Sequence, residues 1–211
     1  MAYTGSRSLR VAALALVMAT SGSGAGALAQ DTAVAIFAGG CFWSIESDFD
    51  HAPGVLETTS GYIGGHVPNP TYQQVVTETT GHREAVRVVY DPAVTSYEKL
   101  LTAYWHMTDP LDAAGQFCDY GESYTPAIYA MDDAQLAAAK ASKVEVAKKL
   151  GAEVATLVTM APQFYPAEDY HQNFYLTNAD HYKRYRAGCG KNAKVEARWG
   201  KDAFLGLNGH L

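Results

Sequence analysis

The sequence contains little cysteine, no C-x-x-C pair and no H-E-x-x-H motif. Its three cysteines, Cys41, Cys118 and Cys189, are too few among 211 residues for a fold built on disulfides. Without paired cysteine or histidine motifs, no metal ligands are expected. In an oxidising compartment an odd number of cysteines leaves at least one thiol unpaired, which makes a reactive thiol a hypothesis to test.

Positive charge is also scarce. The 22 acidic residues outnumber the 16 lysines and arginines, and the formal net charge is −6. Such a chain is a poor match for polyanions, so neither nucleic acid nor an anionic membrane is expected as a partner.

The beginning of the chain has no long apolar run. Arg7 and Arg10 precede an apolar stretch over 11–19, which is shorter than the roughly 20 residues that span a bilayer. Small residues then lead to an A-x-A signal at 27–29. This pattern predicts a signal peptide over residues 1–29 and export to the periplasm or the medium. An uncleaved anchor or a disordered tail is the alternative. Cleavage would change the formal net charge from −6 to −8 by removing two arginines.

Residues 30–211 are interpreted as a single domain, because they contain no repeat and no obvious linker. The hydrophobic patterns predict strands at 33–38, 55–62, 83–90, 127–131 and 154–160, and helices at 41–50, 96–107 and 132–149. Two successive β-α-β units favour an α+β fold, a ferredoxin-like two-layer sandwich with helices on one face of a mixed sheet. Long loops and a C-terminal tail complete the expected domain.

The stretch Gly39-Gly40-Cys41-Phe42-Trp43 lies where the first strand gives way to the first helix. A helix start carries unpaired N–H groups and partial positive charge, so a thiolate at Cys41 is expected to have a lowered pKa. The two glycines would allow another molecule to come close. A buried core cysteine is the alternative interpretation, because cysteine is often buried.

Polar residues in the loops extend this hypothesis. Glu84 begins a strand, Asp119 follows Cys118, and the phenols Tyr72 and Tyr124 lie in loops. A thiolate, a carboxyl group and phenols could together bind a small polar oxygen. Phe42 and Trp43 would provide an apolar wall beside it. Each of these residues alone also has an ordinary structural explanation.

Several motifs in order make the chain resemble the A-type peptide methionine sulfoxide reductases. The resemblance covers roughly residues 33 to 200. The matching segments are GCFW followed by Glu46, GYIGG at 61–65, TYQQV at 71–75, GHREAV at 81–86, DP at 109–110, GQFCDYGESY at 115–124 and AEDYHQNFY at 167–175.

The resemblance implies an enzyme that reduces methionine S-sulfoxide, free or in proteins, and so repairs oxidative damage. Cys41 matches the nucleophile that attacks the sulfoxide sulfur, and Glu84 matches the acid that protonates its oxygen. Tyr72 and Tyr124 match the phenols that bind that oxygen, and Asp119 matches a supporting carboxylate. Phe42 and Trp43 match the wall that receives the substrate methyl group.

The resemblance also implies how the enzyme is recycled. Cys41 would become a sulfenic acid that a second thiol must resolve. Cys189, in a glycine-flanked tail that could swing to Cys41, matches the family's C-terminal recycling position. Cys118 is the rival, since it could attack first and pass the disulfide to Cys189, or it could be a bystander. A thioredoxin-like thiol reductant, no small-molecule cofactor and a monomeric state are expected.

Two departures from the family pattern concern residues near the site. Thr108 stands where many members have histidine before Asp-Pro, and Thr125-Pro126 stand where Arg-Ser is usual. Losing that arginine removes a fixed positive charge and several hydrogen-bond donors.

Two other functions were weighed. A cysteine hydrolase or acyltransferase would pair Cys41 with a histidine such as His82 or His171. A non-catalytic module would use two of its cysteines in a static disulfide.

Overall fold

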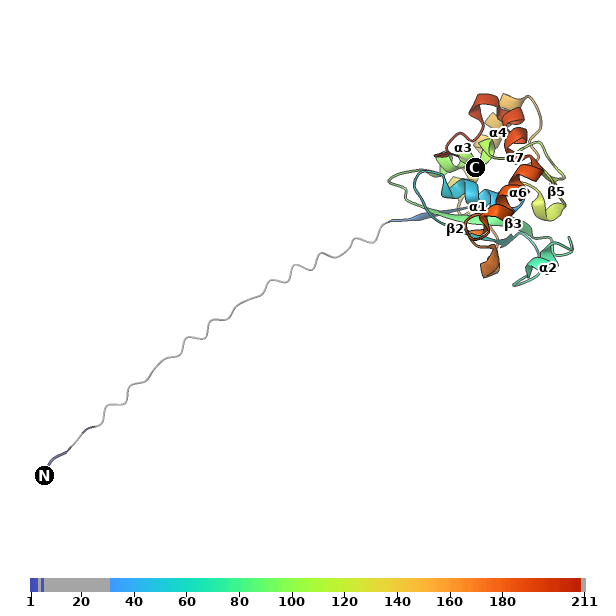
Figure 1. Ribbon diagram of the computed structural model, residues 1–211. Helices are drawn as coiled ribbons and strands as arrows, with labels where there is room; N and C mark the ends of the chain where they lie inside the picture. The colour runs from blue at the N-terminus through green and yellow to red at the C-terminus, as the bar shows by residue number, and fades with distance from the viewer. Residues whose placement is uncertain (4, 6–30, 210–211) are drawn as a thin grey trace.

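The computed structural model describes residues 1–3, 5 and 31–209 (Figure 1). The signal peptide expected over residues 1–29 falls almost entirely outside the described residues and stays a prediction. The described domain is built on a six-stranded sheet. Its strands are β1 (Ala33–Ala38), β2 (Val55–Ile63), β3 (Arg83–Tyr90), β6 (Ala127–Ala130), β7 (Leu157–Met160) and β8 (Phe164–Pro166).

The strand order is β7-β6-β1-β3-β2-β8. The four central strands pair antiparallel throughout, and helices separate β1 from β2 and β3 from β6, which is the ferredoxin-like arrangement. β7 joins one edge parallel to β6, and β8 joins the other edge antiparallel to β2. The predicted α+β sandwich with a mixed sheet is therefore confirmed.

Three main helices pack with this sheet, namely α1 (Phe42–Asp50), α3 (Tyr97–His106) and α4 (Asp133–Leu150). Their starts follow ordinary capping chemistry, since the side chains of Ser96 and Asp132 accept hydrogen bonds from the backbone amides of Lys99 and Gln135. Strand β1 shows how the sheet separates two apolar layers. Phe37 joins the core under the helices, whereas Ile36 joins a smaller cluster on the opposite face.

The loops carry shorter elements. They are α2 (Tyr72–Val75), the two-stranded sheet of β4 (Gly115–Gln116) and β5 (Asp119–Tyr120), and the 3-10 turns η1 (Glu122–Tyr124), η2 (Asp169–His171) and η3 (Gly200–Asp202). Among the described residues, no helix combines the length and the apolar character that crossing a membrane would require.

The segment expected to be a flexible C-terminal tail is instead helical. It forms α5 (Phe174–Thr177), α6 (Ala179–Cys189) and α7 (Lys191–Trp199), coloured orange to red beside α1 in Figure 1. Asp48 of α1 binds Arg186 of α6 at 2.8 Å and Lys191 of α7 at 2.7 Å. All three side chains are at most 4% exposed, so a buried ion cluster fixes these helices to α1.

Candidate active site

Cys41 is the N-cap residue of α1 and follows two glycines whose role is structural. Gly40 has a φ of +88°, and a Cβ there would lie 2.6 Å from the Cβ of Gln116. A Cβ at Gly39 would lie 2.9 Å from side-chain atoms of both Ile45 and Thr108. The expectation that the glycines clear a path for another molecule is therefore corrected: they make room for the protein's own core.

The thiol of Cys41 lies among acidic and phenolic groups. Its hydrogen-bond partners are the hydroxyl of Tyr185 and the backbone amide of Trp43. Burial, and then the nearby carboxylate of Glu84, raise the pKa of Cys41 well above its ordinary value. This corrects the expectation of a low pKa at the helix start, because desolvation outweighs the helix amide. Cys41 is therefore a thiol at rest.

Glu84 enters the same space from β3 and is 2% exposed. Its Oε2 accepts a hydrogen bond of 2.9 Å from the amide of Phe42, the first residue of α1. Burial raises the pKa of Glu84 to about 8, although the hydrogen bond from Phe42 opposes this shift. Glu84 is therefore protonated at neutral pH, as a general acid beside Cys41 must be.

The two predicted phenols and Asp119 reach the site from three different loops. Tyr72 begins α2 and hydrogen-bonds to Tyr124 at the end of η1. Burial, with Glu84 next, raises the pKa of Tyr72 to about 12, so both phenols are donors at neutral pH. Asp119 of β5 interacts electrostatically with Cys41 and Glu84, and burial raises its pKa. The structure thus brings all five predicted catalytic residues together.

Phe42 and Trp43 are the aromatic side of the site. The Phe42 ring is 1% exposed, and its centroid lies 4.9 Å from that of His171. Trp43 stacks on Phe174 at 3.7 Å and donates from Nε1 to Nδ1 of His171 at 3.1 Å. These contacts hold both rings in fixed orientations beside the thiol, where an apolar wall was predicted.

Cys118 and Cys189 form a disulfide with a Cα–Cα distance of 5.0 Å, while Cys41 is free. The bond joins the β4–β5 loop, which is next to Asp119, to the last residue of α6. Cys118 is exposed and Cys189 is 7% exposed. Both sulfurs lie near a carboxylate oxygen of Asp119, and they are bonded to each other, so Asp119 lies directly beside the disulfide.

Sequence reasoning missed residues that build the site from the second half of the chain. Tyr185 contacts Cys41 and also donates a hydrogen bond of 2.5 Å to Oδ2 of Asp119. Glu168 accepts hydrogen bonds of 2.9 Å from the hydroxyl of Tyr62 and from the amide of Tyr72. Tyr185 precedes Cys189 by four residues, and this helical spacing was the available signal.

The two departures from the family pattern have local explanations. The buried hydroxyl of Thr108 donates to the carbonyl of Tyr104 at 2.9 Å, so it is satisfied within α3. The hydroxyl of Thr125 accepts a hydrogen bond of 2.8 Å from Nε of Arg83. The guanidinium of Arg83 on β3 therefore contacts the residue that stands where the family's arginine is usual.

The structure does not favour a cysteine hydrolase. Nδ1 of His82 accepts from the amide of Gly65 at 3.1 Å, and its Nε2 lies 2.8 Å from the carbonyl of Val67. His171 uses Nδ1 for Trp43. Within the described residues neither histidine is a hydrogen-bond partner of Cys41.

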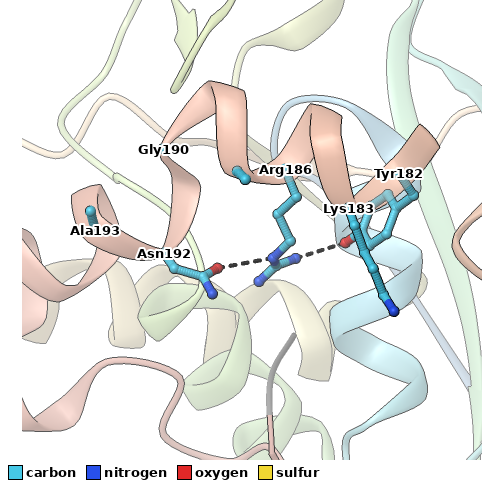
Figure 2. Close-up of a pocket in the computed structure, with 7 residues that line it drawn as sticks. Tyr182, Lys183, Arg186, Gly190, Asn192 and Ala193 are labelled. Atoms are coloured by element: carbon cyan, nitrogen blue, oxygen red, sulfur yellow. Dashed lines mark hydrogen bonds between the residues drawn. The ribbon is translucent and has the colours of Figure 1, made fainter. Parts of the chain in front are cut away.

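A cavity of about 480 Å³ lies between α6 and α7. Arg186 is one of the residues that line it, and Figure 2 shows its guanidinium hydrogen-bonded to the hydroxyl of Tyr182, at 2.8 Å, and to Oδ1 of Asn192, at 2.9 Å. None of the predicted site residues lines this cavity.

Comparison with known proteins gives one consistent family. Residues 33–203 match the model of the family described as peptide methionine sulfoxide reductase. Peptide methionine sulfoxide reductase MsrA 2 of Rhizobium meliloti is 50% identical over 182 residues, which cover 86% of this chain and 91% of the relative. The MsrA 2 of Caulobacter vibrioides is 48% identical over 193 residues, covering 91% and 96%.

Solved structures agree. The methionine sulfoxide reductase A of Corynebacterium diphtheriae is 31% identical and has a TM-score of 0.64, covering 70% of this chain and 76% of that chain. The reduced form of Mxr1 from Saccharomyces cerevisiae is 28% identical and has a TM-score of 0.66, with coverage of 70% and 86%.

Proposed function

The chain belongs to the peptide methionine sulfoxide reductase family, and on this premise we propose how its own residues reduce methionine sulfoxide. One observation carries the assignment of roles. The buried carboxyl of Glu84, with its pKa raised to about 8, faces the thiol of Cys41 across the start of α1. Sulfoxide oxygen is a poor leaving group until it is protonated, so a nucleophile beside a neutral acid suits this reaction.

In the first half of the reaction the sulfur of Cys41 attacks the sulfur of the substrate. The S–H proton of Cys41 is lost to a base as the S–O bond breaks, and the oxygen passes to Cys41 with the proton of Glu84. Methionine leaves, Glu84 becomes a carboxylate and Cys41 becomes a sulfenic acid. The O–H groups of Tyr72 and Tyr124 hold the oxygen, since both phenols keep their protons at neutral pH. Phe42 and Trp43 contact the methyl group.

In the second half the oxidising equivalent passes to the Cys118–Cys189 pair. Cys189, which lies on the same helix as Tyr185, attacks the sulfenic acid, and water leaves as the Cys41–Cys189 disulfide forms. Cys118 then attacks Cys189 and releases Cys41 as a thiolate. The described disulfide with Cys41 free is the state that this relay produces. A swinging tail was expected to bring Cys189 to Cys41. Because α6 ends at Cys189 and α7 begins at Lys191, we propose that this movement uses a hinge at Gly188 or Gly190.

An external dithiol of thioredoxin type returns the enzyme to its reduced form. Its thiolate attacks Cys118, because Cys118 is the exposed sulfur of the pair and Cys189 is buried. The mixed disulfide is then cleaved by the donor's second thiol. No prosthetic group takes part in these steps.

The enzyme is exported and works in the periplasm or outside the cell as a monomer. Support comes from the arginines, the short apolar run and the A-x-A site within residues 1–29, which precede the family match at residue 33. Its substrates are free methionine sulfoxide and oxidised proteins. Mass spectrometry of the protein purified from the exported fraction would show a mature chain beginning at Gln30; a chain retained inside the cell with its first residues intact would contradict export.

A direct test of the reaction uses the two sulfoxide epimers of methionine with a thiol reductant. The wild-type chain should convert the S epimer and leave the R epimer, and Cys41→Ser should abolish conversion. Normal multiple turnover by Cys41→Ser would overturn the assignment of the nucleophile. Repeated turnover without any added reductant would instead contradict thiol-dependent recycling.

A further inference from the structure

The hydroxyl of Tyr185 lies between two groups of the active site. It donates to Oδ2 of Asp119 at 2.5 Å and also hydrogen-bonds to the thiol of Cys41. Its ring packs edge-on against Trp43, with centroids 5.8 Å apart and an interplanar angle of 85°. This ring contact with Trp43 holds Tyr185 where its hydroxyl reaches both partners.

The phenol of Tyr185 has a single proton to donate, and this fixes the direction of the hydrogen bonds that connect Cys41, Tyr185 and Asp119. While Tyr185 donates to the Asp119 carboxylate, its oxygen can only accept from Cys41, which at rest is a thiol. The chain therefore runs in one direction, from the S–H group through the phenol to the carboxylate. Such a chain can move a proton over its whole length without forming a phenolate.

Cys41 needs such a path because its surroundings oppose simple ionisation. The titratable groups that face it come from six elements and are Tyr72, Glu84, Asp119, Tyr124, Tyr185 and Lys191. Burial and the carboxylates raise the pKa of the thiol, so a free thiolate is a minor form. A base must take the proton during attack, and Glu84 is itself protonated.

We propose that Tyr185 is a further catalytic residue, which relays the proton of the Cys41 thiol to Asp119 as the sulfur attacks the sulfoxide. The S–H bond breaks as a proton joins the Tyr185 oxygen, and the former Tyr185 proton joins Oδ2 of Asp119. The negative charge moves from Asp119 to the sulfur, while the proton of Glu84 goes to the sulfoxide oxygen. This step rests on the proposed function.

The relay is built from the elements that also carry the recycling cysteines. Asp119 directly follows Cys118, and Tyr185 precedes Cys189 by one turn of α6. The Cys118–Cys189 disulfide therefore connects the loop that carries Asp119 to the helix that carries Tyr185. Burial raises the pKa of Asp119, but the hydrogen bond from Tyr185 and the charges of Lys191 and Lys194 oppose that shift and favour the ionised form that the relay requires as its acceptor.

The relay predicts a specific pH dependence. The reactive form has a neutral Cys41, an ionised Asp119 and a protonated Glu84. The second-order rate of sulfoxide reduction in a single turnover should therefore rise through the pKa of Asp119 and fall above pH about 8 as Glu84 ionises. Attack by a thiolate formed in equilibrium from Cys41 would instead give a rate that climbs about tenfold per pH unit up to about pH 8 and stays level above it, and this result would overturn the relay.

The test compares Tyr185→Phe with Tyr182→Phe in the pre-reduced mature protein. Both tyrosines lie on α6, Tyr182 buried and Tyr185 half-buried, but the hydroxyl of Tyr182 accepts a hydrogen bond from Arg186 (Figure 2), whereas Tyr185 bonds to Cys41 and Asp119. Tyr185→Phe should slow reduction of the S-sulfoxide at least about tenfold, and Tyr182→Phe should stay within about twofold of wild type. Equal slowing by both variants, or no slowing by Tyr185→Phe, would overturn the relay.

A double-mutant cycle tests the path itself. Because both residues serve one proton transfer, Tyr185→Phe with Asp119→Asn should be no more than about twofold slower than the slower single variant. Independent, multiplying effects would contradict the relay. Alkylation of Cys41 by iodoacetamide separates this claim from the proposed function, since it needs no sulfoxide. Tyr185→Phe should move the pH at which Cys41 reacts upward, and an unchanged profile would count against the contact.

Discussion

Burial in this site raises the pKa of individual residues, which therefore keep their protons to a higher pH than exposed groups of the same type. Glu84 is an acid with its pKa near 8, and Cys41 stays a thiol at the start of a helix. The backbone amide of Phe42, the first residue of α1, donates a hydrogen bond to Glu84. The start of this helix therefore positions the acid as well as the nucleophile. The protonated pair is thus ready for a substrate that needs a proton and a sulfur nucleophile together.

Glu84→Gln should keep the hydrogen bond from Phe42, because an amide oxygen can accept it, but it removes the transferable proton. The single-turnover rate should fall by about 10² to 10⁴, and the decline above pH 8 should disappear. Glu46→Gln is the matched control, since Glu46 is also buried with its pKa raised to about 7 but binds the amide of Asn173. Rapid-quench assays from pH 5 to 10 would measure both; a fast Glu84→Gln variant would contradict the role of Glu84.

Gly40→Ala should destabilise the fold, because Gly40 has a positive φ and its missing Cβ leaves space for Gln116. The backbone strain alone is expected to cost about 1–3 kcal/mol. Urea denaturation of Gly40→Ala would measure it, with Gly188→Ala as the control, since a Cβ at Gly188 would contact nothing within 4 Å. Equal stability of the two variants would show that Gly40 is replaceable.

The individual residues of the site were predictable only in part. The roles of Cys41, Glu84, Tyr72, Tyr124 and Asp119 came from ordered motifs, and the structure brings these residues together. The prediction of a lowered pKa for Cys41 was wrong, because burial and nearby carboxylates are properties of the assembled site and cannot be read from the segment GGCFW. Tyr185 was missed because it belongs to no motif, and because its helical spacing from Cys189 carries no meaning in a segment that was predicted to be a flexible tail.

At the scale of elements, α6 and α7 do more than carry a resolving cysteine. They close over α1, contribute Tyr185, and are fixed to α1 by the buried ion cluster of Asp48, Arg186 and Lys191. One carboxylate serves two buried cations, so its loss would leave both without their counter-charge.

Asp48→Asn should therefore lower the free energy of unfolding by about 3–5 kcal/mol. The control is Glu57→Gln, which removes an exposed ion pair with Arg87 at 4.0 Å and should cost less than about 1 kcal/mol. Urea denaturation at pH 7 would compare the two variants. An Asp48→Asn variant as stable as Glu57→Gln would show that the cluster does not hold the helices.

The longer elements could be predicted, and the short ones could not. Strand β3 matched its predicted range of 83–90, and α3 and α4 matched within about two residues, because apolar periodicity and capping residues mark them. β4 and β5 have two residues each, which is too short for any period to show. Helices α6 and α7 are rich in charge and their buried faces use Tyr182, Arg186 and Lys191, so they looked like a polar tail.

At the scale of the whole molecule, the disulfide closes a loop of 71 residues between the first half of the domain and its C-terminal helices. Chain entropy predicts that such a cross-link stabilises the fold by about 4 kcal/mol. Reduction should therefore lower the thermal midpoint by roughly 10 °C. Calorimetry with and without reductant would measure this, and Cys189→Ser should show no response to reductant. A wild-type midpoint that ignores reductant would mean that the bond constrains little.

Central to the account is the passage of oxidising equivalents from Cys41 to the Cys118–Cys189 pair. The most direct measurement counts the methionine formed per pre-reduced enzyme when S-sulfoxide is added without reductant, and then maps the disulfides by mass spectrometry. Wild type should form about two methionines, one stored as the Cys118–Cys189 disulfide and one as oxidised Cys41, and Cys189→Ser should form about one. A wild-type yield of about one with Cys118 and Cys189 still reduced would contradict the account.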